Sequence, residues 1–376
     1  MQFSNYANRS GEATYCYACM RVLKRKTKEC PNCHSPVPYV PTNPQLLTPG
    51  TLLASRYLIG RPLGSGGFGA TYIACDLRDN TVCAVKEFFP SGLCTRSAAG
   101  ARVIPSPDEE GSFSKYLGSF LDESRRLQGL SGAEGVVRVT DSFQENGTAY
   151  YVMEYLSGKT LKAYMHDEPV GLSPQEVLGL IAQVLRGLSA VHAHGLLHRD
   201  VSADNIIRQE DGRLTLIDFG SARETQVVAK TVFVKGRYTA PEQKLGDRQG
   251  PYTDIYAVGV LLFLLLVGRL PAQNVGTLES INAAKRDLPP KVCALVNRAM
   301  QPNPAKRYQT AADMLRDVEE CAVSLAAGPS RRHFHPDHSA PKPQKRRLSR
   351  AARTVLLSVL ALLAALIFLV LLALLL

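Results

Sequence analysis

The feature that most constrains this chain is the run His198-Arg199-Asp200-Val201-Ser202-Ala203-Asp204-Asn205, which Asp218-Phe219-Gly220 follows. It supplies an isolated carboxylate, an amide five residues later, and a second carboxylate after the strand-like run 214–217. Phosphoryl transfer from ATP needs such a set, because one Asp orients the acceptor hydroxyl and takes its proton while an Asn and another Asp hold Mg²⁺. Each short motif alone is a weak signal, so the order of the remaining motifs decides the interpretation.

Composition and charge set the outer limits. The 376 residues, of which 45% are hydrophobic, give room for two to three domains and a large core. The net charge of +11 comes from the ends of the chain. Residues 1–41 carry six basic and two acidic side chains, and residues 331–353 carry eight basic side chains and one acidic side chain. The balanced middle argues against a large nucleic-acid-binding surface there.

Cysteine usage and the N-terminus indicate the compartment. Five cysteines are scattered and do not form the pattern of a disulfide framework: Cys75, Cys83, Cys94, Cys293 and Cys321. The first 15 residues are polar and lack the apolar region of a secretory signal. We therefore expect a reducing, cytosolic environment for everything before the C-terminal tail.

Two CxxC pairs lie near the N-terminus, formed by Cys16, Cys19, Cys30 and Cys33. Two such pairs can place four thiolates around Zn²⁺, and a segment this short with few apolar residues could hardly fold without a metal or a staple. The alternatives to a zinc site are a redox-active cysteine pair and two disulfides. His34, next to Cys33, is a candidate to replace one of the cysteines as a zinc ligand. The basic spacer between the pairs is either a contact for nucleic acid or an acidic partner, or a solvated loop. Prolines from Pro36 to Pro49 then predict an extended linker.

A glycine-rich hairpin follows, with the sequence Gly64-Ser65-Gly66-Gly67-Phe68-Gly69 between two predicted strands. Glycines there let backbone N–H groups approach phosphate oxygens without a Cβ in the way. A dinucleotide-binding turn would lead into a helix, whereas here strand 71–74 comes next. The following strand, 81–86, ends in Lys86. Residues 91–112 form an insertion rich in Gly, Ser, Pro and Arg, which predicts a flexible loop.

Further elements are expected in order along the chain. A helix begins near Phe113 and carries Glu123, strands 136–139 and 149–155 flank a turn, and a second helix runs from Ser173 to about His194. Ser173 with Glu176 and Pro174 is a helix-start signal. The apolar helix 260–267 is too short to span a bilayer.

These motifs, taken together over residues 51–325, resemble the protein kinases, and the bacterial serine/threonine branch is the most similar. The resemblance implies an α+β, bilobal fold, with a small β-rich lobe at about 51–155 and a large helical lobe at about 156–325. Residues 1–41 would be a zinc ribbon and 42–50 a linker. Serine/threonine rather than tyrosine specificity is an analogy with that branch.

The resemblance also assigns site residues. Asp200 is the expected catalytic base, Asn205 and Asp218 the Mg²⁺ ligands, and Lys86 the clamp on the ATP phosphates, paired with Glu123; Asp122 and Glu110 are rival partners. Met153 is the expected gatekeeper of the adenine pocket and Glu154–Leu156 the hinge. The nucleotide-contacting set is completed by the loop Gly64–Gly69 and by Thr71, Ala84, Leu156 and Ile207.

The activation segment is expected at residues 221–239, closed by Ala240-Pro241-Glu242. Arg199 beside Asp200 marks kinases controlled by phosphorylation in that segment, where Thr225 and Thr231 are candidates. Self-association for autophosphorylation in trans is a further expectation. Glu242 is predicted to form a buried, structural ion pair with Arg307.

Two positions depart from the family pattern. Ser202 stands where most serine/threonine kinases have a Lys that touches the γ-phosphate, and Lys235 stands where a Thr is usual. Our hypothesis is that Lys235 supplies the missing ammonium across the cleft; the alternative is that it points to solvent. The same two residues favour a pseudokinase scaffold, which Lys86, Asp200, Asn205 and Asp218 argue against. A third interpretation, nucleic-acid binding through the ribbon, would require salt-sensitive binding by residues 1–41.

The C-terminal end has two parts. Residues 326–353 form a basic segment, rich in Pro and His, that is expected to be disordered, and residues 354–376 are 23 residues without a charge. Such a run is long enough to span a ~30 Å hydrocarbon core. The basic residues before it place the kinase on the cytoplasmic side and favour anionic lipids. We therefore expect a single-pass tail anchor without an outer sensor domain, and a kinase with protein substrates that uses ATP, Mg²⁺ and structural Zn²⁺.

Overall fold

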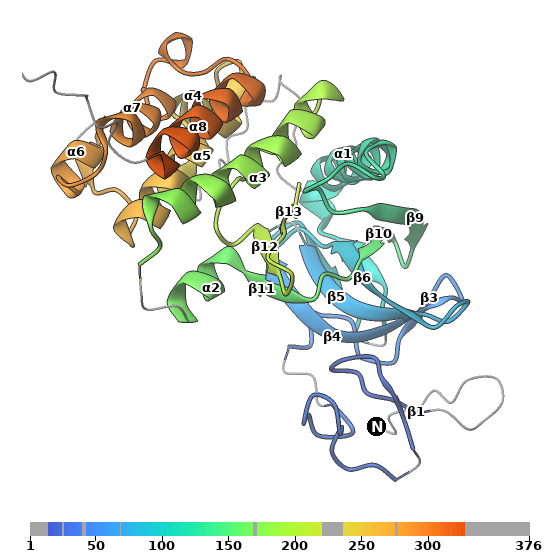
Figure 1. Ribbon diagram of the computed structural model, residues 1–376. Helices are drawn as coiled ribbons and strands as arrows, with labels where there is room; N and C mark the ends of the chain where they lie inside the picture. Colours follow the sequence, from blue (N-terminus) through green and yellow to red (C-terminus); the bar gives the residue numbers. More distant parts are fainter. Residues whose placement is uncertain are drawn as a thin grey trace, which may run out of the picture. The chain divides into compact units, whose positions relative to one another are not determined.

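The computed structural model describes residues 14–327, apart from residues 25, 40–42, 68, 99, 168–170, 220–235 and 275–276. The chain divides into one compact unit over residues 1–328 and a second over 329–376, and the described residues all belong to the first. A small, β-rich lobe precedes a large, helical lobe, as Figure 1 shows. The expected α+β class and bilobal order are therefore confirmed.

The small lobe is built on a six-stranded antiparallel sheet. Its strands, in spatial order, are β3 (Leu52–Leu53), β4 (Tyr57–Gly66), β5 (Gly69–Asp76), β6 (Thr81–Phe88), β10 (Thr148–Glu154) and β9 (Val139–Glu145). The strand expected at 136–139 begins only at Val139. Val137 instead donates its N–H to the Leu216 carbonyl at 3.0 Å, so this segment ties the sheet to the large lobe.

Helix α1 (Glu110–Gly129) packs against β9 and β10 and starts slightly earlier than expected, after a short 3-10 turn (Pro107–Glu109). The insertion before it is not the flexible loop that its composition predicts. It folds into a hairpin of β7 (Cys94–Arg96) and β8 (Val103–Pro105), with Cys94 and Val103 buried in the core. The composition misled because two buried apolar residues are enough to fix so short a hairpin.

The large lobe surrounds two buried helices, α3 (Pro174–Ala193) and α5 (Pro251–Val267). Ser173 caps α3 with a complete capping box to Glu176, as the sequence predicts. Helix α5 is apolar on every side and is buried over nearly its whole length. The remaining helices are α2 (Leu161–Asp167), α4 (Pro241–Leu245), α6 (Ile281–Ala284), α7 (Pro290–Ala299) and α8 (Ala311–Ala326), with 3-10 turns at Gly236–Tyr238 and Pro304–Lys306.

A second, three-stranded sheet underlies the catalytic loop. Its strands are β11 (Gly158–Thr160), β12 (Ile206–Gln209) and β13 (Leu214–Leu216), and β13 is the short strand expected before Asp218. A further small hairpin, β14 (Gln273–Asn274) with β15 (Thr277–Leu278), lies between α5 and α6. Within the large lobe Arg307 forms the predicted buried ion pair with Glu242, with Nη1–Oε1 and Nη2–Oε2 distances of 2.7 and 2.9 Å.

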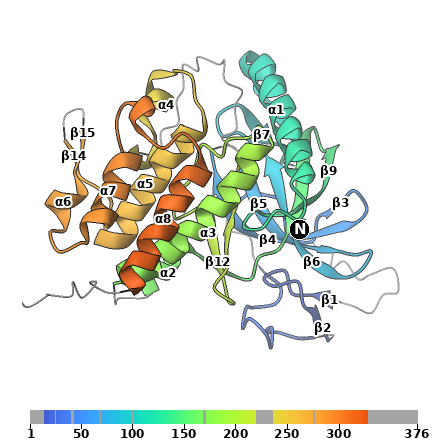
Figure 2. The ribbon, with the colours of Figure 1, turned by 45° about the horizontal axis from the view of Figure 1, so that its top comes forward.

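The N-terminal segment folds against the small lobe. Strands β1 (Thr14–Tyr15) and β2 (Val22–Leu23) form a hairpin beside β4 in both ribbon views (Figures 1 and 2). The segment expected to be an extended linker also packs onto this lobe: Leu47 is 1% exposed, and its N–H donates to Tyr72 Oη at 3.1 Å. A single leucine among prolines was too weak a signal to predict this anchoring.

Among the residues that the structure describes, no helix has the length and apolar character needed to cross a bilayer. The predicted span at 354–376 and the basic segment before it lie outside those residues.

Candidate active site

The catalytic loop and the following strand are held together by backbone and side-chain hydrogen bonds. Asn205 donates its Nδ2 to both the carbonyl and the Oδ2 of Asp200, each at 2.8 Å. The Asn205 carbonyl in turn accepts the N–H of Ile217 at 3.0 Å. The structure therefore brings the predicted base, the predicted amide ligand and the strand leading to Asp218 into one place.

A buried carboxylate that the sequence did not single out holds the loop from below. Asp254, on α5 and fully buried, accepts the N–H groups of His198 at 2.9 Å and Arg199 at 2.6 Å, and it bonds His192 Nε2 at 2.8 Å. Burial raises the pKa of Asp254, but the hydrogen bond and charge of His192 outweigh it and keep the pKa below its usual value. Arg199, next to Asp200, has a φ of 62°, a costly conformation that these bonds maintain.

Phe219 packs under the loop and positions its neighbour. Its ring lies 4.4 Å from that of His198, whose Nε2 bonds the Ile217 carbonyl at 3.1 Å. Asp218 itself has a φ of 60°. This arrangement turns the Asp218 carboxylate toward the small lobe, where it meets Lys86.

Lys86 joins the two lobes through a charged hydrogen bond. Its Nζ donates to Asp218 Oδ1 at 2.5 Å, and it lies 5.5 Å from the centre of the Tyr151 ring, across β6 and β10. Burial lowers the pKa of Lys86, but the Asp218 carboxylate, Tyr151 and Glu123 outweigh it and hold the pKa well above its usual value. The ammonium is therefore charged and is poised next to a predicted metal ligand.

The expected ion pair between Lys86 and Glu123 is not formed within 4.0 Å in this structure, because Lys86 pairs with Asp218 instead. Glu123 is nevertheless the acidic residue of α1 that faces the site: it is buried, whereas Asp122 is exposed and bonds Arg125, and Glu110 is exposed. Among the described residues, Glu123 Oε1 has no hydrogen-bond partner. Burial raises the pKa of Glu123 to about 7, with Lys86 opposing the rise and Asp218 adding to it.

The glycine-rich loop forms the tight end of the hairpin between β4 and β5, where Gly66 pairs with Gly69. A Cβ added at Gly64 or Gly66 would meet no heavy atom within 4 Å, so the space beside them is open to a ligand. Phe68 lies outside the described residues. Ser65 and Gly67 complete the loop, and the absence of a Cβ at its glycines lets a ligand approach the backbone from that open space.

The residues expected around adenine lie on adjoining strands. Thr71 pairs with Lys86 across β5 and β6, and Ala84 pairs with the buried Met153 across β6 and β10. After Met153, Glu154 and Leu156 lead into the large lobe, and Ile207 lies on β12 opposite Thr160. All of them except Met153 and Ala84 are partly exposed.

The two departures from the family pattern differ in what the structure shows. Ser202 is 1% exposed, and no residue in the described part of the chain hydrogen-bonds its Oγ. Lys235, like Gly220 and the candidate phosphorylation sites Thr225 and Thr231, lies outside the described residues. A serine at this position brings no positive charge to the loop.

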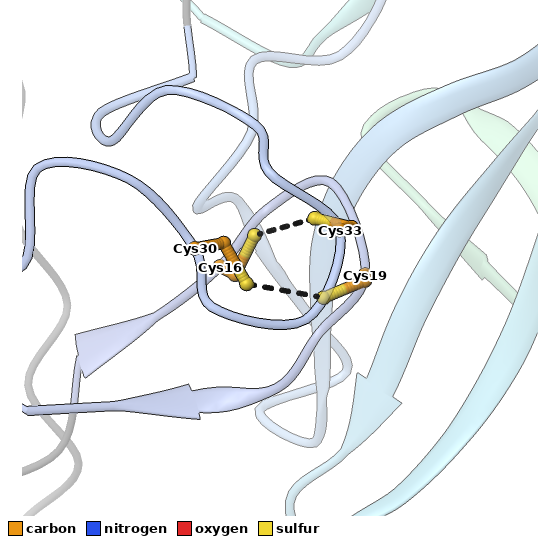
Figure 3. A group of neighbouring side chains, drawn as sticks. All are labelled: Cys16, Cys19, Cys30 and Cys33. Carbon is orange, nitrogen blue, oxygen red and sulfur yellow. Dashed lines mark hydrogen bonds between the residues drawn. The ribbon is translucent and has the colours of Figure 1, made fainter.

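Separately from the catalytic site, the four N-terminal cysteines converge (Figure 3). Cys16 and Cys33 Sγ are 3.6 Å apart, Cys19 and Cys30 Sγ are 3.7 Å apart, and all four sulfurs lie within 4.8 Å of one another. A disulfide would need about 2.05 Å. A tetrahedral Zn²⁺ site with Zn–S of about 2.3 Å has S–S edges of ~3.8 Å, close to the Cys16–Cys33 and Cys19–Cys30 distances.

The catalytic residues also fit the groups that their chemistry implies. A carboxylate and an amide oxygen from Asp218 and Asn205 are ligands that Mg²⁺ prefers. The charged Lys86 and the open space beside Gly64 and Gly66 suit an anionic phosphate chain.

Comparisons with known proteins agree with this geometry. The family described as "Protein kinase domain" matches residues 57–323. Serine/threonine-protein kinase PknL of Mycobacterium tuberculosis is 30% identical over 316 residues, covering 80% of this chain and 72% of PknL. Serine/threonine-protein kinase PrkC of Bacillus subtilis is 30% identical over 285 residues, covering 72% of this chain and 41% of PrkC. The solved structure "PpkA-294 apo form" is 30% identical, with a TM-score of 0.63 over 73% of this chain and 99% of that one.

Proposed function

This chain belongs to the protein kinase family as a eukaryotic-like serine/threonine kinase, and we propose which residues carry its reaction and where it acts. The observation that carries the assignment is the meeting of four groups: Lys86 bonds Asp218, and Asn205 bonds Asp200, while Asn205 and Ile217 tie the two pairs together. These residues come from both lobes, and their convergence is what phosphoryl transfer requires.

We assign one role to each of them. Asp200 accepts the proton of the substrate hydroxyl and orients it. Asn205 and Asp218 would hold Mg²⁺, which when bound neutralises charge on the phosphates. Lys86 binds the phosphate oxygens beneath the loop Gly64–Gly69, and Glu123 is in place to receive Lys86 when Asp218 engages the metal.

Adenine would lie between Thr71 and Ala84 above and Ile207 below, with Met153 at the back. The hinge residues Glu154 and Leu156 would bond adenine through their backbone. Such contacts do not depend on side-chain identity, so strand register supports this part of the proposal.

The four cysteines of the ribbon would hold structural Zn²⁺. The sulfur spacing supports this assignment, and so does the small size of the ribbon's own core, a few residues around Cys16, Ala18, Leu23 and Cys30. Metal analysis of the purified chain should return one zinc per chain, and serine at two of the four cysteines should abolish it.

We further propose that residues 354–376 anchor the kinase in a membrane with its catalytic unit on the cytoplasmic side. The uncharged run and the preceding basic residues support this. The kinase would then act on protein substrates near the membrane surface, and on a second copy of itself.

Autophosphorylation tests the catalytic assignment. The full chain in detergent is incubated with labelled ATP and Mg²⁺ beside an Asp200→Ala variant, and phosphosites are mapped. We expect incorporation at Thr225 or Thr231 that the variant abolishes. A folded chain that binds ATP and incorporates no phosphate would contradict the assignment and favour a scaffold.

A further inference from the structure

The N-terminal ribbon is fastened to the strand that carries the phosphate-binding loop. Arg61, in the middle of β4, donates its N–H to the Tyr17 carbonyl at 2.6 Å and its Nε to the Ala18 carbonyl at 2.9 Å. Tyr15 Oη also donates to Asn80 Oδ1 at 3.0 Å, and Asn80 lies in the turn between β5 and β6. A freely tethered ribbon would have no such bonds, so this one is an added part of the small lobe.

An apolar contact accompanies these hydrogen bonds. Tyr15 and Met20 of the ribbon are 4% and 3% exposed, and they pack with Leu58, Ile73 and Cys75 of β4 and β5. The contact is close enough to require glycine at position 60, since a Cβ there would lie 2.5 Å from the Tyr17 carbonyl oxygen and 2.6 Å from Met20 Sδ. The ribbon and strand β4 are therefore packed together as closely as residues in a protein core.

The ribbon residues that make this contact belong to the first cysteine pair. Tyr17 and Ala18 lie between Cys16 and Cys19, and Met20 follows directly. Within this turn Met20 donates its N–H to the Cys16 carbonyl at 2.7 Å and has a φ of 58°. A non-glycine residue keeps such a backbone conformation only where its surroundings impose it. The surroundings here are the grouped thiols, which include Cys16 and Cys19, and the strands β4 and β5 against which Met20 packs.

The strand at the other side of the contact runs into the glycine-rich loop. Gly60 and Arg61 come shortly before Gly64, and the pairing of β4 with β5 is irregular from Ile59 to Pro62 and again from Pro62 to Gly64. The regular ladder is therefore interrupted at the place where the ribbon bonds. The ribbon supplies the support that the ladder lacks at the base of the loop.

We propose that metal binding by the four cysteines controls the affinity of the kinase for ATP. With metal bound, the turn 16–20 holds Gly60 and Arg61 and so keeps the loop Gly64–Gly69 in its nucleotide-binding position. Without metal, the turn loosens, β4 loses its support, and ATP binds more weakly. This inference rests on the zinc assignment proposed above, and it adds a regulatory role to a site otherwise expected to be structural.

Equilibrium ATP binding and zinc content, measured on the full chain in detergent, test the proposal. The double variant Met20→Ala with Arg61→Ala weakens the contact, because it removes the Met20 side chain and the Arg61 Nε bond to Ala18, and it leaves all four cysteines in place. Arg78→Ala, which changes an exposed arginine of the same lobe outside the contact, is the matched control. We expect the double variant to keep its zinc and to raise the Kd for ATP about fivefold or more, within the usual range of coupling between sites. Arg78→Ala should leave the Kd unchanged.

Removing the metal provides the second arm. Chelation of zinc from the unmodified chain should also raise the Kd for ATP, and it should raise the Kd less in the double variant, where the connection is already weakened. The proposal would be overturned if neither the double variant nor the chelated chain differed from the unmodified chain in its Kd for ATP. If the purified chain contained no zinc, both the zinc assignment and the proposed control of ATP affinity by metal would be contradicted. The Kd of the double variant would still show whether the ribbon supports the loop.

Discussion

Lys86, Asp218 and Glu123 form a group of one cation and two carboxyl groups within the catalytic centre, and their arrangement defines a state of the site. Lys86 is hydrogen-bonded to Asp218, and Glu123 is left buried with an oxygen that has no partner. An unpaired buried carboxylate is costly, and it relieves the cost by taking up a proton. The pKa of about 7 at Glu123 is the expression of that cost.

The first prediction concerns the pH dependence of stability without nucleotide. The pKa of Glu123 is raised on folding, from about 4.5 to about 7, so the folded chain binds more protons than the unfolded chain between these values. Its contribution to stability therefore falls as pH rises through this window and is constant above it. The Tm advantage of Glu123→Gln over the unmodified chain should grow from pH 5 to pH 7 and then level off.

Asp122→Asn is the matched control, because Asp122 is the next residue of α1 and lies on its exposed face. Its Tm difference from the unmodified chain should not follow the same window. If the Tm difference between Glu123→Gln and the unmodified chain were constant from pH 5 to pH 8, Glu123 would not be a protonated buried acid in the nucleotide-free kinase.

The second prediction concerns Lys235 and the buried Ser202. If Lys235 supplies the positive charge that Ser202 cannot, its ammonium acts on the transferring phosphoryl group and stabilises the transition state. Lys235→Ala should then lower kcat by about 10²-fold or more, with far less effect on the KM for ATP. An unchanged kcat would contradict the hypothesis, and Lys235→Arg should retain more of the activity than Lys235→Ala.

At the scale of elements, the helices and strands that could be predicted are those marked by a local sequence pattern. Helix α3 is marked by the cap at Ser173, and the strands β5 and β6 by short, mainly apolar runs next to a glycine-rich turn. The active-site motifs were found because their spacing is fixed by chemistry. The β7–β8 hairpin and the anchored linker were missed because each depends on a few distant contacts, such as Leu47 with Tyr72, that leave no period in the sequence.

Asp254 and the pairing of Lys86 show the same limit within the site. Asp254 looks like one polar residue at the start of an apolar helix, and only the fold brings it beneath His198 and Arg199. The sequence likewise names Lys86, Asp218 and Glu123 but cannot say which carboxylate holds the lysine in a given state.

The third prediction concerns the hairpin formed by the insertion. Arg96 of β7 donates to Glu87 Oε2 at 2.6 Å, with the two side chains 4% and 0% exposed, and Glu87 also accepts from Tyr72 and Tyr150. Removing one partner of a buried pair leaves an uncompensated charge. Arg96→Ala should therefore lower the free energy of unfolding by about 3–5 kcal/mol, measured by chemical denaturation.

The control for this prediction is Arg102→Ala, an exposed arginine in the same insertion, which should change stability by less than about 0.5 kcal/mol. Adding Glu87→Gln to Arg96→Ala should recover part of the loss, since the buried charge is then removed. Equal stabilities of Arg96→Ala and Arg102→Ala would mean that the insertion does not hold the small lobe.

At the scale of the whole molecule, the ribbon, the linker and the insertion all attach to the small lobe, on the strands that we propose to hold the nucleotide. The ribbon contacts β4 and β5, Leu47 bonds Tyr72 of β5, and Arg96 bonds Glu87 of β6. Additions to the kinase fold are thus concentrated on the lobe that has to adopt one position to bind ATP. The large lobe has its own closing contact in Glu242 and Arg307.

The fourth prediction concerns the membrane. A run of 23 uncharged residues should partition irreversibly into a bilayer, whereas the basic segment before it contributes only salt-sensitive attraction to anionic lipids. The full chain should therefore stay in the membrane fraction after washing with high salt and with alkaline carbonate, and a chain ending at residue 353 should not. Protease added to the cytoplasmic side should digest the kinase, and protease added to the outer side should not. Release of the full chain by high salt alone would assign membrane association to the basic segment, and digestion from the outer side would reverse the orientation that its arginines and lysines predict.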